Sequence, residues 1–225
     1  MKDYELYSQL KLPKNSKIVI RLDGRSFHSL SGVLNLNKPY DERFISLMVN
    51  TSSDLFKEFS PSLIYTFSDE INILLNEIPF SARVEKLDSV LASFASSSFS
   101  LNLNNYFDDI ILPKPIAFDS RVVLLPKEDI LTYFKWRQDE AWRNCVNSYG
   151  ITFLKSKYSP AEANDKIKGM NLSDIHELLF KNGINLNNVD CSHKRGVALY
   201  RQFDSSVIED YNIPIFTNNF INKFI

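Results

Sequence analysis

The chain has 225 residues, enough for one α/β core and a modest appendage without disulfides to stabilise it. Its 44% hydrophobic and 24% charged residues exclude a disordered, collagen-like or simple coiled-coil chain. The net charge of −1 argues against a surface coated with phosphate contacts. However, residues 1–120 contain 12 basic and 15 acidic side chains, whereas residues 121–225 contain 14 and 12. We therefore expect any polyanion to bind the second half.

The sequence has no pattern of a membrane or secreted protein. No stretch approaches the roughly 20 apolar residues that span a bilayer, and Met1 to Leu10 has neither an apolar run nor an Arg-rich pattern. Cys145 and Cys191 are far apart and lack CxxC spacing, so we expect neither a disulfide framework nor a cysteine-based zinc site. These features favour a cytoplasmic protein that does not bind a membrane.

A strand and a long helix open the ordered part of the chain. Residues 17–22 are β-branched and almost all apolar, which is typical of a central strand buried on both faces. This strand stops at Asp23-Gly24. Asp41 is a suitable N-cap for a helix whose apolar residues follow a 3.6-residue period, and Pro61 closes that helix.

A hairpin, a second long helix and a fourth strand follow. The apolar strands at residues 63–67 and 71–75 are separated only by residues 68–70, a spacing that predicts a hairpin. Residues 83–106 have the periodicity of a helix, and residues 116–125 form a strand that ends before a proline. The order strand, helix, strand, strand, helix, strand is that of a ferredoxin-like domain.

This topology brings carboxylates together at one sheet edge. The first and third strands of such a sheet are antiparallel neighbours at its centre, so Asp23 should lie next to Asp69 and Glu70. Crowded carboxylates cost several kcal/mol unless a cation neutralises them, and Mg²⁺ prefers carboxylates plus substrate phosphates. The alternative is a plain Asp-Gly turn and a solvated hairpin tip. The convergence at central strands favours a metal site, and two ions about 4 Å apart would suit nucleotidyl transfer.

The second half reads as mainly helical. We predict helices at residues 127–148, after Ser159-Pro160, and from an N-cap at Ser173 to Phe180. A late strand is expected from Gly196 to Phe203. The predicted fold is therefore α+β, with a βαββαβ catalytic core at residues 1–125 and a mainly helical C-terminal extension at residues 126–225.

Five motifs occur in a fixed order along the chain. They are Arg21-Leu-Asp-Gly-Arg-Ser-Phe-His28, Lys38-Pro39, Ser68-Asp-Glu70, Phe118-Asp-Ser-Arg-Val-Val123 and Trp136-Arg-Gln138. This ordered set resembles the motifs of the tRNA-histidine guanylyltransferase family, the 3′-to-5′ polymerases, and weaker similarity continues through Lys194-Arg-Gly196. The resemblance implies a polymerase-like palm of ferredoxin-like topology, which agrees with the predicted strand order.

The resemblance also implies a set of site residues. Asp23 and Asp69 are similar to the family's metal-binding aspartates and the Gly24 carbonyl to its third protein ligand, for two Mg²⁺ ions, with Glu70 as an adjoining catalytic residue. A nucleoside triphosphate, ATP or GTP, would bind Asp23, Gly24, Arg25, Ser26, Phe27, His28, Lys38, Ser68 and Asp69. Arg25 and Lys38 would contact its phosphates. His176 and His193 share no ligand spacing, and we expect no catalytic role for them.

The mechanism implied by the resemblance needs no protein nucleophile. A nucleoside triphosphate would activate the tRNA 5′-phosphate, and the 3′-hydroxyl of an incoming nucleotide would attack it. Members that add guanosine to histidine tRNA carry a His- and Asn-rich stretch where this chain has Asp139-Glu-Ala-Trp-Arg-Asn-Cys145. This departure favours the guanylyltransferase-like branch of archaea and bacteria, which repairs 5′-truncated tRNA against a template. Addition of guanosine at position −1 of histidine tRNA is the alternative.

Binding of tRNA is expected in the more basic second half. The candidates for backbone contacts are Arg137, Arg143, Lys194 and Arg195, although a single basic residue is more often ordinary solvated surface, and only the group carries weight. We therefore expect residues 126–225 to contribute to tRNA binding and oligomerisation. A near-neutral chain binds tRNA better if several subunits share the contact, and the resemblance implies a homotetramer.

Two further functions remain open at this stage. A nucleotide cyclase would use the same palm and paired aspartates, but without Trp136-Arg-Gln138 or a basic second half. An RNA-binding module would expose aromatic side chains on its central strands, whereas this chain has Val19, Ile20, Ile71 and Ile73 there.

Overall fold

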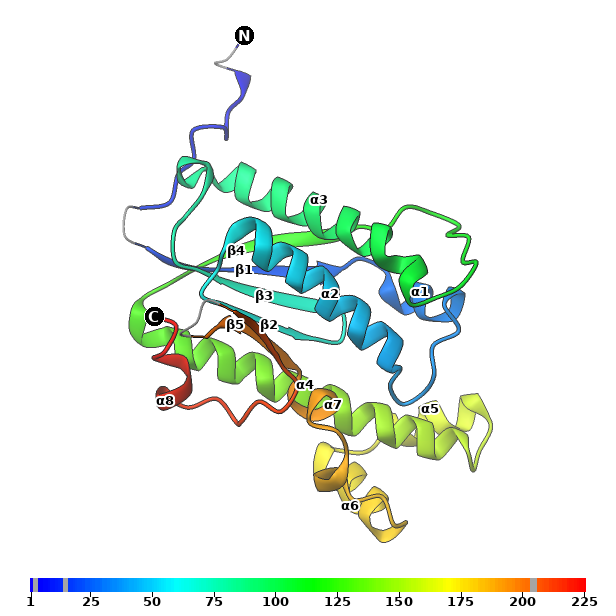
Figure 1. Cartoon of the computed structure of the whole chain (residues 1–225). Coiled ribbons are helices and arrows are strands. Elements are labelled where there is room, and N and C mark those ends of the chain that lie inside the picture. The colour runs from blue at the N-terminus through cyan, green and yellow to red at the C-terminus, as the bar shows by residue number, and fades with distance from the viewer. Residues whose placement is uncertain (2–3, 14–15, 203–205) are drawn as a thin grey trace.

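The computed structural model describes residues 1, 4–13, 16–202 and 206–225. Within them a six-stranded antiparallel sheet has the order β4-β1-β3-β2-β5-β6 (Figure 1). The strands are β1 (Lys17–Gly24), β2 (Leu63–Phe67), β3 (Glu70–Leu75), β4 (Phe118–Leu125), β5 (Val197–Arg201) and β6 (Val207–Asp210). The first four alternate with helices in the predicted βαββαβ order, and the α+β fold class is confirmed.

Helices cover both faces of this sheet. They are α1 (Phe27–Val33), α2 (Glu42–Phe59), α3 (Val84–Asn102), α4 (Ile130–Lys155), α5 (Pro160–Lys168), α6 (Leu172–Lys181), α7 (Cys191–Arg195) and α8 (Asn218–Ile221). Short 3₁₀ turns lie at Phe80–Ala82, Leu103–Asn105, Lys127–Asp129 and Leu186–Asn188. No helix in the described ranges is both long and apolar enough to cross a membrane.

The alternation of side chains along β1 divides the core into two layers. Ile18, Ile20 and Leu22 pack toward α2 and α3, whereas Val19 packs toward α4 on the opposite face (Figure 1). All four side chains are fully buried. The aliphatic run was predicted to be a central strand for this reason, because only a strand covered on both faces is apolar at odd and even positions.

Local capping explains where several helices begin. Asp41 caps α2 as predicted, since its carboxylate accepts a hydrogen bond from the Arg43 amide at 3.0 Å. The predicted N-cap of α6 was wrong: Ser173 lies inside the helix, and Asn171 is the cap. Asn171 accepts from the Asp174 amide at 2.9 Å, and the Asp174 carboxylate accepts from the Asn171 amide at 3.1 Å. This reciprocal pair satisfies two amides, which Ser173 does not.

The second half both extends the sheet and forms a separate projection. β5 pairs with β2 and β6 forms the edge, so two strands of the second half complete the sheet of the first. Phe203, the predicted end of β5, lies outside the described residues.

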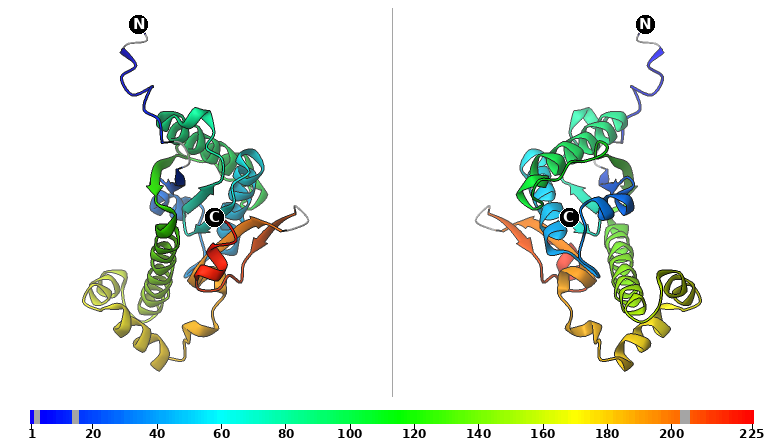
Figure 2. Two further views of the ribbon diagram at one scale, coloured as in Figure 1. Left: turned by 90° about the vertical axis from the view of Figure 1, so that its left-hand side faces the viewer. Right: turned by 90° about the vertical axis from the view of Figure 1, so that its right-hand side faces the viewer.

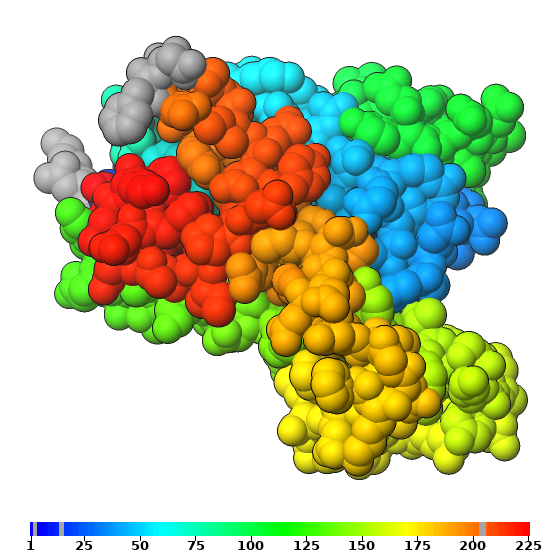
Figure 3. Space-filling view, turned by 60° about the horizontal axis from the view of Figure 1, so that its bottom comes forward, coloured from blue at the N-terminus to red at the C-terminus, as the bar shows by residue number. Residues whose placement is uncertain are grey.

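Helices α5 and α6 pack on the C-terminal part of α4 and project from the body (Figures 2 and 3). Gly150 permits this approach, because a Cβ there would overlap the side chain of Ile175. The domain boundary at residue 125 stays a prediction.

Candidate active site

Three carboxylates lie at the end of the central strand pair. Asp23 of β1 is opposite Glu70 of β3, and the Gly24 amide donates to the Asp69 carbonyl at 3.0 Å. On the other side of β1, Asp23 is opposite Asp119 of β4. The structure therefore brings together the carboxylates that the strand order predicted, and adds Asp119 to them.

Burial and repulsion by neighbouring carboxylates raise the pKa values of both central aspartates. Loss of hydration is the main cause of the raised pKa of Asp23, followed by the nearby Asp119 carboxylate. For Asp69, loss of hydration is again the larger cause of the raised pKa, followed by Asp23 itself. Arg121 offsets this repulsion in part, with its guanidinium 3.8 Å from Asp23 and 3.3 Å from Asp119. Two crowded carboxylates beside the Gly24 carbonyl are an all-oxygen donor set that fits Mg²⁺.

The raised pKa values predict a distinctive pH dependence of stability. The ordinary pKa of an aspartate is 3.8, and between that value and the raised pKa the folded chain binds more protons than the unfolded chain. These groups therefore lower the free energy of unfolding as pH rises through their folded pKa values. In chelator, Asp69→Asn should therefore gain thermal stability relative to wild type as pH rises from 4 to 7. Added Mg²⁺ should reduce this difference. Parallel melting curves for the two proteins at every pH would contradict the repulsion described here.

The Glu70 side chain is buried in the core and bonded to α4. Only 7% of it is exposed, and its Oε1 accepts from Arg137 Nε at 2.9 Å and from Asn72 Nδ2 at 2.8 Å. Asn72 in turn accepts from the Tyr133 hydroxyl at 2.6 Å. Burial raises the pKa of Glu70, against the opposing effect of Asn72 and Arg137. Glu70 thus joins β3 to α4 directly behind the Asp69 turn, and its catalytic role stays a prediction.

Gly24 is required by close packing after β1. A Cβ at this position would lie 2.6 Å from the ring of Phe27, which is itself 6% exposed and packs on Phe99 and Phe118. Ser26 adopts a left-handed conformation, with φ of 62°, to turn the chain into α1. This compact turn keeps Gly24 at the strand end, where its amide donates to the Asp69 carbonyl.

A pocket of about 390 Å³ opens next to Asp69. Its volume lies in the range of about 300 to 1,000 Å³ that is typical of small-molecule sites. Five of the predicted nucleotide-binding residues line it: Phe27, His28, Lys38, Ser68 and Asp69. Two others, Arg25 and Ser26, line a separate cavity of about 60 Å³. Asp23 and Gly24 do not line the larger pocket, although they adjoin Asp69.

The far wall of this pocket was missed from the sequence. Asn144, Asn147 and Ser148 of α4 line it together with Asn37 and Tyr40. The spacing of the three α4 residues places them on one helical face, which was the available signal. Nothing in the sequence alone indicated that this face would meet the segment around Lys38, because the two lie more than one hundred residues apart.

One of the four predicted tRNA contacts is buried in the core. Arg137 was expected at the surface, but only 8% of its side chain is exposed, because it pairs with buried Glu70. Arg143 is exposed and pairs with Glu140. Lys194 donates to the Asn187 carbonyl at 2.6 Å, and Arg195 donates to the Ile213 carbonyl at 3.2 Å. Contact of Arg143, Lys194 and Arg195 with tRNA stays a prediction.

The chain matches known family models along most of its length. The model described as tRNAHis guanylyltransferase matches residues 1–126, and that described as Thg1 C terminal domain matches residues 128–218. A probable tRNA(His) guanylyltransferase of Dictyostelium discoideum is 34% identical over 88% of this chain and 82% of that protein. The tRNA(His) guanylyltransferase of Schizosaccharomyces pombe is 34% identical over 90% and 79%.

Solved structures of similar proteins have the same fold. A bacterial tRNA(His) guanylyltransferase-like protein in complex with ATP superposes with a TM-score of 0.83 at 26% identity, covering 99% of this chain and 95% of that one. The tRNA(His) guanylyltransferase of Saccharomyces cerevisiae superposes with a TM-score of 0.81 at 26% identity, covering 94% and 95%.

Proposed function

Because this chain belongs to the tRNAHis guanylyltransferase family, we propose that it adds nucleotides to the 5′ end of tRNA against a template and so repairs 5′-truncated tRNA. The observation that carries this proposal is the pair Asp23 and Asp69 at the edge of a pocket of about 390 Å³. Two crowded carboxylates beside a polar pocket suit nucleotidyl transfer, in which positioning and electrostatics supply most of the catalysis.

The reaction proceeds by two displacements at phosphorus. The tRNA 5′-phosphate first attacks a nucleoside triphosphate and releases pyrophosphate. The 3′-hydroxyl of the incoming nucleotide then attacks the activated 5′-phosphate and releases a nucleoside monophosphate. Asp23, Asp69 and the Gly24 carbonyl are the residues that would hold two Mg²⁺ ions. Bound Mg²⁺ supplies Lewis-acid polarisation of the phosphates and a lower pKa for the attacking hydroxyl.

The pocket supplies the groups that would orient the triphosphate. Lys38 and His28 line the pocket with Asp69 and offer donors to phosphate oxygens. The amides of Asn144 and Asn147 offer donors and acceptors to a base edge. ATP or GTP as the activating nucleotide is supported by similar bacterial proteins, whose structures are complexes with ATP and with GTP.

Residues 139–145 differ from the His- and Asn-rich stretch of members that add guanosine, and this difference favours templated addition over guanosine-specific addition. Of residues 139–145, only Asn144 lines the pocket, and Arg143 instead pairs with Glu140. With few groups from this stretch at the pocket, the template strand is left to select the incoming nucleotide. Addition of guanosine at position −1 remains the second candidate, supported by the names of the curated relatives.

Removal of the Lys38 charge should weaken nucleotide binding. A hydrogen bond to a charged group contributes about 1.5 to 3 kcal/mol, so Lys38→Met should raise the KM for the triphosphate by about 10- to 100-fold. The matched control is Lys57→Met, because Lys57 lies outside the pocket and pairs with Asp54. Steady-state kinetics with varied triphosphate measure both. Equal KM values for the two variants would show that Lys38 does not contact the triphosphate.

The tRNA acceptor end is proposed to lie along β1 and α4, on the side of Asp23. Trp136 is 51% exposed there, with the guanidinium of Arg21 5.7 Å and that of Arg137 4.1 Å from its ring centroid. An exposed aromatic ring next to cations suits an unpaired nucleotide.

Assembly as a homotetramer is part of the proposal. Its support is the apolar N-terminal segment, in which Leu6 and Tyr7 are 76% and 75% exposed. Light scattering should give four times the 26.0 kDa of one chain.

Incubation with labelled triphosphate, Mg²⁺ and a 5′-truncated tRNA distinguishes the candidate functions. A product extended at its 5′ end supports the proposal. A cyclic nucleotide formed without tRNA would identify a cyclase instead. Retention of tRNA with no chemical change would identify a binding module.

A further inference from the structure

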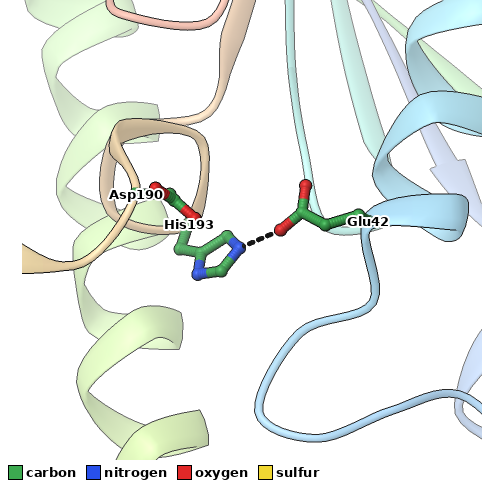
Figure 4. A group of neighbouring side chains, drawn as sticks. All are labelled: Glu42, Asp190 and His193. Carbon is green, nitrogen blue, oxygen red and sulfur yellow. Dashed lines mark hydrogen bonds and ion pairs between the residues drawn. The ribbon is translucent and has the colours of Figure 1, made fainter.

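A second group of metal-ligand side chains lies outside the site described above. Glu42, Asp190 and His193 place one ligand atom each within 4.8 Å of one another (Figure 4). Glu42 is the first residue of α2, whereas Asp190 is the N-cap of α7 and His193 lies within α7. The group therefore joins the two halves of the chain, at residues that no sequence spacing connects.

The imidazole of His193 is held in one orientation. Its Nδ1 lies 3.0 Å from the Tyr149 hydroxyl and its Nε2 lies 2.7 Å from Glu42 Oε1. Tyr40 stacks on the ring with a centroid distance of 4.3 Å and an interplanar angle of 10°. Only 10% of the His193 side chain is exposed. Histidine ligands to metals typically bond a polar partner through one ring nitrogen and the metal through the other. In His193 the polar partner is on Nδ1, which leaves Nε2 facing Glu42.

The charge of the group is unbalanced. Asp190 is the N-cap of α7, yet its carboxylate makes no capping hydrogen bond. It instead lies within 4.8 Å of ligand atoms of Glu42 and His193, so the group has two carboxylates and one imidazole. The neighbouring cations do not neutralise them directly, because Lys194 and Arg195 donate to the main-chain carbonyls of Asn187 and Ile213. A divalent cation at this point would relieve the repulsion between the carboxylates.

We propose that Glu42, Asp190 and His193 bind one Zn²⁺ ion per chain. One imidazole nitrogen and two carboxylates, with water in the fourth position, suit Zn²⁺, whereas Mg²⁺ prefers oxygen ligands alone. The ion replaces the hydrogen bond between Nε2 and Glu42 Oε1, whose separation of 2.7 Å opens to about 3.3 Å at a tetrahedral angle, and the shared proton is released to solvent. Tyr40, which stacks on His193, lines the nucleotide pocket. The ion therefore ties α2 to α7 directly behind the wall of that pocket.

Calorimetric titration of the whole chain with Zn²⁺ in excess Mg²⁺ tests this site. Excess Mg²⁺ competes for oxygen-only sites such as the one at Asp23, and the readout is binding, so the result is independent of activity on tRNA. We expect one Zn²⁺ per chain and an affinity at least about 10-fold lower in His193→Gln and in Asp190→Asn. The matched control is His176→Gln, because His176 is also partly buried but lies against Trp142 outside the group.

A second variant tests whether weaker Zn²⁺ binding reflects the loss of a ligand or misfolding of the chain. The Glu42 side chain is 65% exposed, so Glu42→Gln should melt in chelator at the same temperature as wild type and still bind Zn²⁺ more weakly. Zn²⁺ should raise the melting temperature of wild type more than that of this variant. No stoichiometric binding to wild type, or equal affinity in wild type and His193→Gln, would overturn the proposal.

Discussion

Replacing Asp69 by asparagine is expected to lower kcat for 5′ nucleotide addition by at least about 10³-fold, because a metal-binding carboxylate supplies several kcal/mol of transition-state stabilisation. The same change should leave the folded chain as stable as wild type or more stable at pH 7. Burial is the larger cause of the raised pKa of Asp69 and repulsion by the Asp23 carboxylate is the second, and the neutral amide removes both. Single-turnover kinetics and thermal unfolding measure the two effects separately.

The matched control for this loss is Asp88→Asn. Asp88 is also a partly buried carboxyl with a raised pKa, but it accepts a hydrogen bond from Ser120 on the α3 side of the sheet. We expect this control to retain activity within about 10-fold, since any effect reaches the site only through packing. A loss of similar size in both variants, or full activity in Asp69→Asn, would contradict the assignment of the metal-binding pair.

Replacing Arg137 by methionine is expected to lower the free energy of unfolding by about 3 to 5 kcal/mol. This is the usual cost of leaving one charge of a buried ion pair without its partner. Arg137 and Glu70 are 8% and 9% exposed, and their atoms Nε and Oε1 are 2.9 Å apart. Methionine keeps the apolar length of the side chain, so the loss reports the charge rather than a cavity. Denaturant unfolding measures it.

The partner variant Glu70→Gln should cost a similar amount. It leaves the buried Arg137 charge without its partner, although glutamine can still accept from Asn72. The double variant Glu70→Gln with Arg137→Met should recover most of the loss, because no unpaired charge is then buried. If the two single losses simply added, the pair would be energetically independent and Arg137 would have another role.

The central part of the site could be predicted from the sequence because it depends on simple patterns. The aliphatic residues of β1 identify a strand covered on both faces, and the order of elements then makes β1 and β3 neighbours. From that order alone, Asp23 had to lie beside Asp69. The same topology also places β4 next to β1, so Asp119 could have been found by the same reasoning.

The remainder of the site depends on contacts between distant segments. The pairing of β5 with β2 and the approach of Asn144 and Asn147 to the Lys38 segment join residues far apart in sequence. Arg137 shows a second limit. A basic residue in a basic half of the chain reads as a surface contact, and only the position of α4 over β3 reveals that it neutralises Glu70 in the core.

The most direct test of templated addition is a change of template. In a tRNA that lacks its first 5′ nucleotide, the unpaired base opposite the gap is varied through all four identities, and the nucleotide added by the wild-type chain is determined for each. We expect the added nucleotide to be the complement of the opposing base in each case, and no addition by Asp69→Asn. Guanosine added regardless of the opposing base would contradict the account and identify the chain as a guanosine-specific enzyme.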